Sequence, residues 1–505
     1  MVETSLTRSA SELGTAFVGA AEAIVRALLL YAALLAWFAV PVLTLRSLAP
    51  ESTALPWIIG ATAGLSILAL CWKIRGLAAG FFRAVSDATL AVSDRSWLIS
   101  CLAIGIVIRC AWAYAFPGTP ASDGLIYVSL ARKLIAGEPY FMSETFAYWP
   151  PGYAFYLSPW LALIPTQRVA IILSNLLLFL VGALGVRALG RTVGGDATGR
   201  VALALFAVWP NLAFQAGMPE KEQVLVALLP WIVLLAVLNA TSLKVGKCLL
   251  GGLLLGMATL VQPALQLFPL VLLFYWVIRR RSLAAPLRML AFTLIGMAVA
   301  IGPWTLRNYR VFDQFVLVST NGGFGLYGAN NPDATGGYLE RWPDDLMRMP
   351  ELEADREGKR RAIAWIIANP ARFVALAFQK QILFMGDDAA GAYQSMKRGK
   401  GSPIDGRYAA AKGASNLFWL AIWALILWGL LAASGPRGGG APHTMIVPLA
   451  FLYSLSLHSI FESSGKYHIV TIGLLSVLAP MILASIPKPR LSGGTFSEPT
   501  IDTQR

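Results

Sequence analysis

The sequence predicts an all-helical protein that crosses a membrane many times. Of its 505 residues, 57% are hydrophobic and only 13% carry a charge, and the mean hydropathy is +0.63. A water-soluble globule does not need that much apolar surface, whereas many apolar runs approach the ~20 residues with which a helix crosses hydrocarbon. The four cysteines lie in or beside apolar runs without paired metal spacing, so we expect small core residues and no disulfide.

Twelve apolar runs are interpreted as membrane helices. A thirteenth span is the alternative, so the expected total is 12 or 13. The first is too long for a secretory signal and lacks a small-residue cleavage site, so we expect it to be retained. An additional piece at 371–385 is short and is interrupted by Arg372 and Lys380, so we expect an interfacial helix there; a thirteenth span would reverse the C-terminal third. The predicted spans are 22–45, 54–72, 97–116, 168–187, 201–217, 223–240, 248–262, 264–278, 287–304, 415–433, 443–460 and 467–485.

Positive charge indicates which ends of these spans face the cytoplasm. The net charge of +14 would suggest nucleic acid as the partner of a soluble protein. Here Lys and Arg gather in alternate connections, for example the linker 73–95 and the run Arg279-Arg280-Arg281, as the positive-inside rule predicts. We therefore expect no nucleic-acid partner, an N-terminus in the cytoplasm, and two large outer loops at 117–167 and 305–414.

These boundaries predict how the chain is organised. Residues 1–95 form two additional spans and a cytoplasmic linker, and the helical core follows at 96–304 with the first outer loop inside it. The second outer loop is 305–414, the last spans are 415–486, and the Gly/Ser/Thr-rich tail 487–505 is expected to be disordered.

The first outer loop begins with a carboxylate at the membrane surface. Ser122 and Asp123 can cap a helix whose apolar residues recur at helical spacing, and Gly137 can end it. Such a helix would lie along the interface with Asp123 in its first turn. A plain capping role for Asp123 is the alternative to a functional one.

Three other polar clusters are expected at the same outer face. They are the acidic link 218–222, the segment 307–332 that follows a span, and the turn 458–468 between the last two spans. Each has a structural explanation, because acids favour helix starts, Gly and Asn favour turns, and Lys anchors span ends. Those explanations do not account for carboxylates and cations on one face. His458 and His468 lack metal-ligand spacing, so a divalent cation has no support.

A carboxylate that faces Lys and Arg at a lipid–water boundary suits group transfer from a lipid-linked phosphate. Phosphate is a good leaving group that needs cations to stabilise its charge, and no acid. The attacking hydroxyl needs a base, and an ionised Asp is a ready acceptor. The sequence has no GxxxxGK[ST] loop, so a soluble nucleotide donor is not expected.

The order of these motifs resembles membrane glycosyltransferases of the GT-C fold, in the branch of the protein O-mannosyltransferases and the bacterial lipid A aminoarabinose transferases. The resemblance covers about 96–485. It is carried by Asp123-Gly-Leu-Ile-Tyr127, Trp149-Pro-Pro-Gly-Tyr153, Glu220 and Glu222, Arg307-Asn308-Tyr309, Asn330-Asn331-Pro332 and Lys466-Tyr467-His468. This sequence departs from the family where Gly124 follows Asp123, where Gln262 precedes a proline, and where Lys466 replaces an Arg.

The resemblance implies inverting transfer of a monosaccharide from a polyprenyl-phosphate donor, such as undecaprenyl phosphate, to an acceptor hydroxyl. The site would face the periplasm from the inner membrane of a bacterium, and the acceptor would be a glycan, lipid A or a protein. Asp123 would be the base, and Arg307, Lys466 and His468 would hold the donor phosphate. Candidates for binding sugar or acceptor, or for supporting Asp123, are Glu220, Glu222, Tyr127, Tyr148, Asn308, Asn330 and Tyr467.

Two other functions remain open from the sequence. A flippase for lipid-linked oligosaccharides or another transporter would carry polar residues deep within its spans. Here the polar groups sit mainly at the outer ends, which favours an enzyme. A polymerase of lipid-linked repeat units would also have a large outer loop. No cofactor is predicted.

Overall fold

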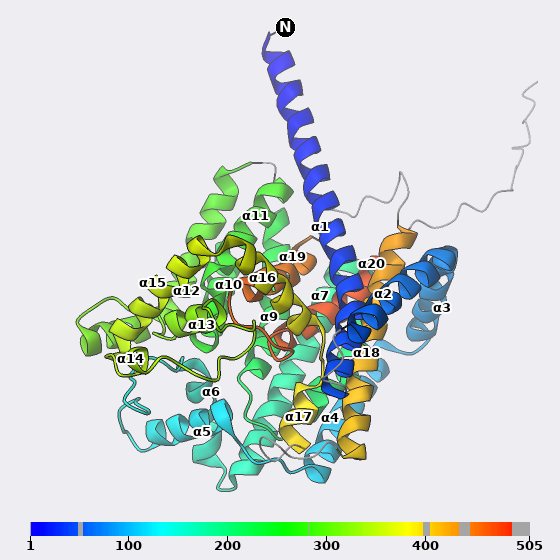
Figure 1. Cartoon of the computed structure of the whole chain (residues 1–505). Coiled ribbons are helices and arrows are strands. Elements are labelled where there is room, and N and C mark those ends of the chain that lie inside the picture. Colours follow the sequence, from blue (N-terminus) through cyan, green and yellow to red (C-terminus); the bar gives the residue numbers. More distant parts are fainter. Residues whose placement is uncertain (1, 49–53, 281, 397–404, 434–444, 487–505) are drawn as a thin grey trace, which may run out of the picture.

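The structure is a computed structural model that describes residues 2–48, 54–280, 282–396, 405–433 and 445–486 (Figure 1). Within these ranges the regular structure is helical, apart from one isolated pairing of Met142 with Thr145. The expected all-helical architecture is therefore confirmed. The tail 487–505, for which disorder was expected, lies outside the described residues.

The helices follow one another along the whole chain. Their bounds are α1 (Val2–Leu48), α2 (Leu55–Lys73), η1 (Arg75–Leu77), α3 (Ala78–Leu90), α4 (Asp94–Ala115), α5 (Ser122–Ile135), α6 (Gly152–Leu163), α7 (Gln167–Val208), α8 (Pro210–Phe214), α9 (Glu222–Thr241), α10 (Val245–Val261), η2 (Pro263–Leu267), α11 (Phe268–Arg280), α12 (Ala284–Phe312), α13 (Gly322–Ala329), α14 (Asp344–Met347), α15 (Glu351–Ala368), α16 (Pro370–Met385), α17 (Ala390–Met396), α18 (Gly406–Ala432), α19 (Ile446–Ile460), η4 (Ile469–Thr471) and α20 (Ile472–Ala484).

Seven of the described helices are long and apolar enough to cross a membrane, namely α1, α2, α4, α7, α9, α12 and α18. Several other predicted spans form apolar helices of 17 residues or fewer, such as α10 and α19. The count of twelve is therefore not confirmed, although a multi-pass membrane protein is. The run expected at the interface forms α16, which meets α15 at an angle of 110° and packs against α1 and α19.

Helix α7 is a hairpin of two helical arms. Gly195 has φ 84° and ψ 179°, outside helical geometry, because only glycine adopts that conformation without strain. Phe179 and Phe206 stack with ring centroids 6.0 Å apart, whereas one straight helix would separate them by about 40 Å. The arms correspond to the predicted spans 168–187 and 201–217. The second arm ends earlier than predicted, at Val208, because Pro210 starts α8.

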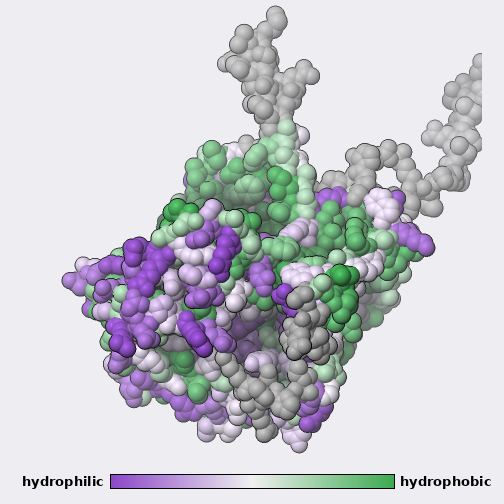
Figure 2. Space-filling model, viewed as in Figure 1, coloured by the Kyte–Doolittle hydropathy of each residue, from purple (hydrophilic) through white to green (hydrophobic). Residues whose placement is uncertain are grey.

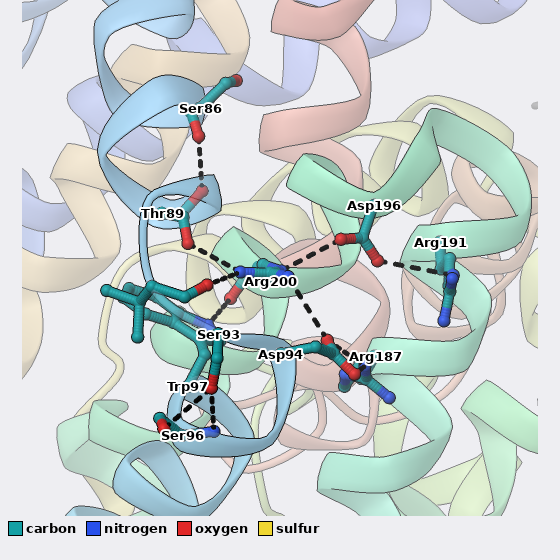
Figure 3. A network of polar contacts seen from close by, with 11 residues as sticks. Ser86, Thr89, Ser93, Asp94, Ser96, Trp97, Arg187, Arg191, Asp196 and Arg200 are labelled. Atoms are coloured by element: carbon teal, nitrogen blue, oxygen red, sulfur yellow. Dashed lines mark hydrogen bonds and ion pairs between the residues drawn. The ribbon is translucent and has the colours of Figure 1, made fainter.

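A charged network joins the tip of this hairpin to the connection between α3 and α4 (Figure 3). Arg200 pairs with Asp196 at 3.0 Å and with Asp94 at 3.6 Å. The same guanidinium donates to the carbonyls of Thr89 and Val92. These contacts fix the N-terminal segment to the core. Helix α1 also packs against α2, α16, α18 and α19, so the helices α1, α2 and α3 pack onto the core.

Polar and apolar surfaces separate as a membrane protein requires. Figure 2 shows hydrophilic residues gathered over the region of α13–α15 and near α5, and hydrophobic residues over the region of α11 and α12. Large apolar side chains remain exposed on spans, for example Val107 on α4 and Val299 on α12. Lipid covers such side chains in a membrane. The helices in these hydrophilic regions, α5 and α13–α15, belong to the two predicted outer loops.

Candidate active site

Lys466 lies between three carboxylates that come from distant parts of the chain. Its Nζ atom is 3.0 Å from Glu220, 3.7 Å from Asp123 and 3.7 Å from Glu222. We call these four residues the Lys466 cluster. The structure thus brings together three of the four polar segments that the sequence analysis assigned to the outer face.

Asp123 is in the first turn of α5, but it does not cap the helix. Ala121 occupies the N-cap position, and no side chain in the described structure makes a capping hydrogen bond there. The capping role predicted for Ser122 and Asp123 is therefore wrong, because the carboxylate turns toward Lys466 instead. The side chain of Asp123 is 38% exposed, against 7% for Glu220 and 4% for Glu222. Asp123 is the carboxylate of the cluster that a substrate can reach.

The ends of α5 explain how it meets the acidic link. At its start, a Cβ atom on Gly124 would lie 3.0 Å from the carbonyl oxygen of Pro219, so a glycine lets α5 press against that link. This contact brings Asp123 beside Glu220. At its end, Gly137 has φ +70° and Glu138 N–H donates to the Lys133 carbonyl at 2.9 Å, which is the predicted glycine stop.

A buried asparagine that the sequence analysis missed supports the acidic link. The Nδ2 atom of Asn175, from α7, donates to the carbonyls of Ala216 at 3.1 Å and Met218 at 2.9 Å. These bonds fix the backbone just before Glu220, and α9 starts at Glu222. An isolated Asn in an apolar span gives no local signal of such a partner, because the link lies about 40 residues further along the chain.

The cluster contains more negative than positive charge. Burial raises the pKa of Glu220 to about 7, although Lys466 acts to lower it. Burial acts to lower the pKa of Lys466, but Glu220, Glu222 and Asp123 together raise it well above its ordinary value. Lys466 therefore stays an ammonium ion, and Glu220 takes up a proton near neutral pH.

Tyrosine side chains wall the cluster. Tyr127 and Tyr153 pack edge to face with ring centroids 5.4 Å apart. Their hydroxyl groups are buried and have no hydrogen-bond partner among the described residues, and the same holds for Glu222 Oε2. Burial keeps the pKa of both phenols well above the ordinary value. Burial, and to a smaller extent the charge of Asp123, raises the pKa of Tyr148 to about 12. Unpartnered polar atoms beside a reachable carboxylate are typical of a site for a polar ligand.

A small cavity adjoins the cluster on its apolar side. Its volume is about 30 Å³, and Glu222, Gln262 and Tyr467 reach its wall. Such a space is large enough for a water molecule. Gln262 is one of the positions at which this sequence departs from the family that it resembles.

Arg307 holds the first outer loop in place. Its guanidinium donates to the carbonyls of Tyr140 and Phe146, each at 2.7 Å, and covers the ring of Trp304. Glu351, which the sequence analysis missed, accepts from the amides of Phe146 at 2.6 Å and Ala147 at 2.9 Å. The two outer loops are therefore clamped together around 140–147. Arg307 also donates to Asn308 Oδ1 at 3.1 Å, and the cation inside the cluster is Lys466.

Both predicted asparagines bind backbone. Asn308 Nδ2 donates to the carbonyls of Val316 and Val318, each at 3.1 Å. Asn330 Nδ2 donates to the carbonyl of Ile460 at 2.9 Å, and the buried Lys380 donates to Asn330 Oδ1. These asparagines shape the second outer loop and connect it to the end of α19.

The residues after Lys466 face the interior. Tyr467 donates to Glu462 at 2.7 Å and stacks on His458. His468 is fully buried, with Nδ1 2.5 Å from the Phe384 carbonyl and Nε2 2.9 Å from Asp388. The structure thus places His468 inside the protein, and not at the surface where we expected it to meet a phosphate. No group of three or more His, Cys, Asp or Glu within the described ranges could hold a metal ion.

No protein-family model matches this chain, and no curated protein matches its sequence. Solved structures do match its fold. The apo oligosaccharyltransferase from Archaeoglobus fulgidus aligns with a TM-score of 0.46 at 14% identity, over 76% of this chain and 50% of that one. ArnT from Cupriavidus metallidurans bound to undecaprenyl phosphate aligns with a TM-score of 0.42 at 12% identity, over 77% of this chain and 78% of that one.

This chain spans half the length of the archaeal enzyme.

Proposed function

We propose that the protein is an inverting GT-C glycosyltransferase that moves a monosaccharide from a polyprenyl-phosphate donor to an acceptor hydroxyl. The observation that carries the proposal is the contact of Asp123, a partly exposed carboxylate, with the Lys466 ammonium ion at 3.7 Å. We further propose that the protein lies in the inner membrane of a bacterium, with this site on the periplasmic side. The acceptor is a glycan, lipid A or a protein.

The transfer is a single displacement. Asp123 accepts the proton of the acceptor hydroxyl while its oxygen bonds to the anomeric carbon of the sugar. The bond from that carbon to the phosphate oxygen breaks, and its electron pair leaves with the lipid phosphate. One displacement inverts the anomeric centre, so no second carboxylate is needed as a nucleophile.

Lys466 stabilises the leaving phosphate. An ammonium group has three rotatable N–H donors, so it can exchange a carboxylate contact for a phosphate oxygen without leaving the site. Protonation of Glu220 near neutral pH reduces the negative charge that would repel the phosphate. The phosphate departs as a stable anion and needs no proton.

The other side chains bind and orient the substrates. Tyr127 and Tyr153 are buried beside the Lys466 cluster, and we propose that they form the packed wall against which the substrates bind. Tyr148 packs against Phe324 of the second outer loop and lies within electrostatic reach of Asp123. Arg307 supports the reaction indirectly by fixing the loop that leads to Tyr148.

The test is transfer by the purified protein in lipid nanodiscs. It is incubated with a panel of polyprenyl-phosphate sugars and candidate acceptors, and consumption of each donor is measured. Asp123→Asn should lower turnover by about 10²- to 10⁴-fold and leave lipid binding unchanged, because Asn cannot accept the proton. Glu138→Gln, near the opposite end of α5, is the matched control. Full turnover by Asp123→Asn would remove Asp123 from the mechanism. Movement of donor across vesicles without transfer would favour a flippase.

A further inference from the structure

A buried polar network lies directly behind Lys466, and the proposed reaction does not use it. His468 and Asp388 are both fully buried, and His468 Nε2 lies 2.9 Å from Asp388 Oδ1. Trp209 Nε1 donates to Asp388 Oδ2 at 2.9 Å, and Asn211 donates to Oδ1. Asp388 N–H in turn donates to Asn416 at 2.8 Å. The network joins four segments that lie far apart in the sequence.

The hydrogen bonds determine how many protons the pair holds. The Phe384 carbonyl can only accept, so Nδ1 of His468 carries a hydrogen. Nε2 and Asp388 Oδ1 must then share a second proton at 2.9 Å, whichever atom carries it. The pair is therefore neutral as a whole. A neutral, fully bonded pair is stable in the interior, whereas either partner alone would leave a buried polar group unsatisfied.

Two contacts connect this buried network to the short link that contains Lys466. His468 is two residues beyond Lys466 in the same short link, and its imidazole ring also stacks on Trp419 at 4.2 Å. On the other side of Lys466, a Cβ atom on Gly465 would lie 1.9 Å from the carbonyl oxygen of Asp387, so this backbone touches the neighbour of Asp388. Residues 387–388 therefore hold the link on both sides of Lys466.

We propose that the buried Asp388–His468 pair is a positioning device that keeps the Lys466 ammonium centred among Asp123, Glu220 and Glu222. Asp388 and His468 act through Lys466 and do not touch the substrate. Only the kinetic effect expected from this positioning rests on the proposed function. The placement of Lys466 can be measured without turnover.

The variant is Asp388→Asn, which keeps the shape of the side chain but turns an NH2 group toward the N–H donor of either Trp209 or Asn211. The matched control is Asp387→Asn, the adjacent carboxylate, which pairs with Lys412 at 2.8 Å near the surface. Its backbone contact with Gly465 does not depend on its side chain. If Asp388→Asn does not accumulate as folded protein, Trp209→Phe replaces it, because that change removes a single hydrogen bond.

The first readout is acylation of Lys466 by a small amine-reactive reagent, measured by mass spectrometry. In the wild-type protein the three carboxylates keep the amine protonated, so labelling is slow. Displacement of Lys466 in Asp388→Asn should raise the labelling rate by about tenfold, as for one unit of pKa. Asp387→Asn should label like the wild type. Equal labelling in all three proteins overturns the inference, even where the proposed transfer is real.

The second readout is kinetic. Asp388→Asn should raise KM for the lipid donor by about 10- to 100-fold while KM for the acceptor changes little, because a misplaced cation weakens the phosphate contact. In a Lys466→Met background the same substitution should add less than about twofold, since the two residues act as one unit. If the losses caused by the Asp388 and Lys466 substitutions multiply in the double variant, Asp388 has only a structural role. A wild-type protein that consumes no lipid donor contradicts the proposed function and leaves the labelling result to decide this inference.

Discussion

Glu220→Gln tests the electrostatics of the Lys466 cluster. Glutamine has the shape of protonated glutamate but does not titrate. Burial raises the pKa of Glu220 from 4.5 to about 7 in the folded protein. Between those two values the folded protein keeps a proton on Glu220 that the unfolded chain has released. Folded-state stability is therefore lost as the pH rises through this window.

The structure gives the size of this effect. A shift from 4.5 to about 7 corresponds to about 3 kcal/mol of stability lost between those pH values. Glu220 is buried, so solvent screens little of it. Glu220→Gln should lack this contribution, and it should be more stable than the wild type at pH 8 by a similar amount. Near pH 5 the two proteins should differ much less.

The assay is thermal unfolding of the wild type and Glu220→Gln in the same detergent from pH 5 to pH 8. The difference between the two proteins isolates Glu220, because every other titrating group is common to both. Glu138→Gln, an exposed position on the same outer loop, corrects for the loss of one carboxylate. Parallel stability curves over the whole range would refute the assignment of a raised pKa to Glu220.

Three other substitutions test separate parts of the structure. Lys466→Met should weaken binding of a polyprenyl phosphate by about 100-fold in a titration, because a charge-assisted contact is lost, and unchanged affinity would exclude Lys466 from the phosphate site. Glu351→Gln should speed proteolysis within 140–147 and lower turnover by about tenfold, because it weakens the two charge-assisted bonds from the amides of that segment. Glu353→Gln, which is exposed on the same helix, should change neither the proteolysis nor the turnover. Arg200→Met should lower the free energy of unfolding by about 2 kcal/mol and leave KM for the donor unchanged, because its network lies at the tip of α7 and not at the site; a changed KM would contradict that separation.

The family resemblance did not distinguish among the basic residues near the site. It treated Arg307, Lys466 and His468 alike as phosphate ligands, because each lies at or near the end of a span. In the structure Lys466 meets the carboxylates, Arg307 binds loop carbonyls, and His468 pairs with Asp388. These differences depend on side-chain direction over the last few ångströms, which position along the chain does not specify.

Other functional residues had no local signal. Asn175, Glu351 and Asp388 each bind a partner at least 40 residues away. In the sequence, Asn175 is an isolated polar residue in a span, Glu351 is an acid at the start of a helix, and Asp388 is an acid in a loop. Their significance comes from the groups that folding brings beside them.

The sequence by itself determined that the chain is helical and membrane-embedded, and it predicted which segments connect the spans and which few acids and cations they carry. Hydropathy and helical period are properties of neighbouring residues, so they can be read along the chain. Only the tertiary structure decided that α7 folds back on itself, that one lysine stands among three carboxylates, and that a buried Asp–His pair lies behind it. Those arrangements are set by packing between distant helices, where a shift of one residue changes which charges meet.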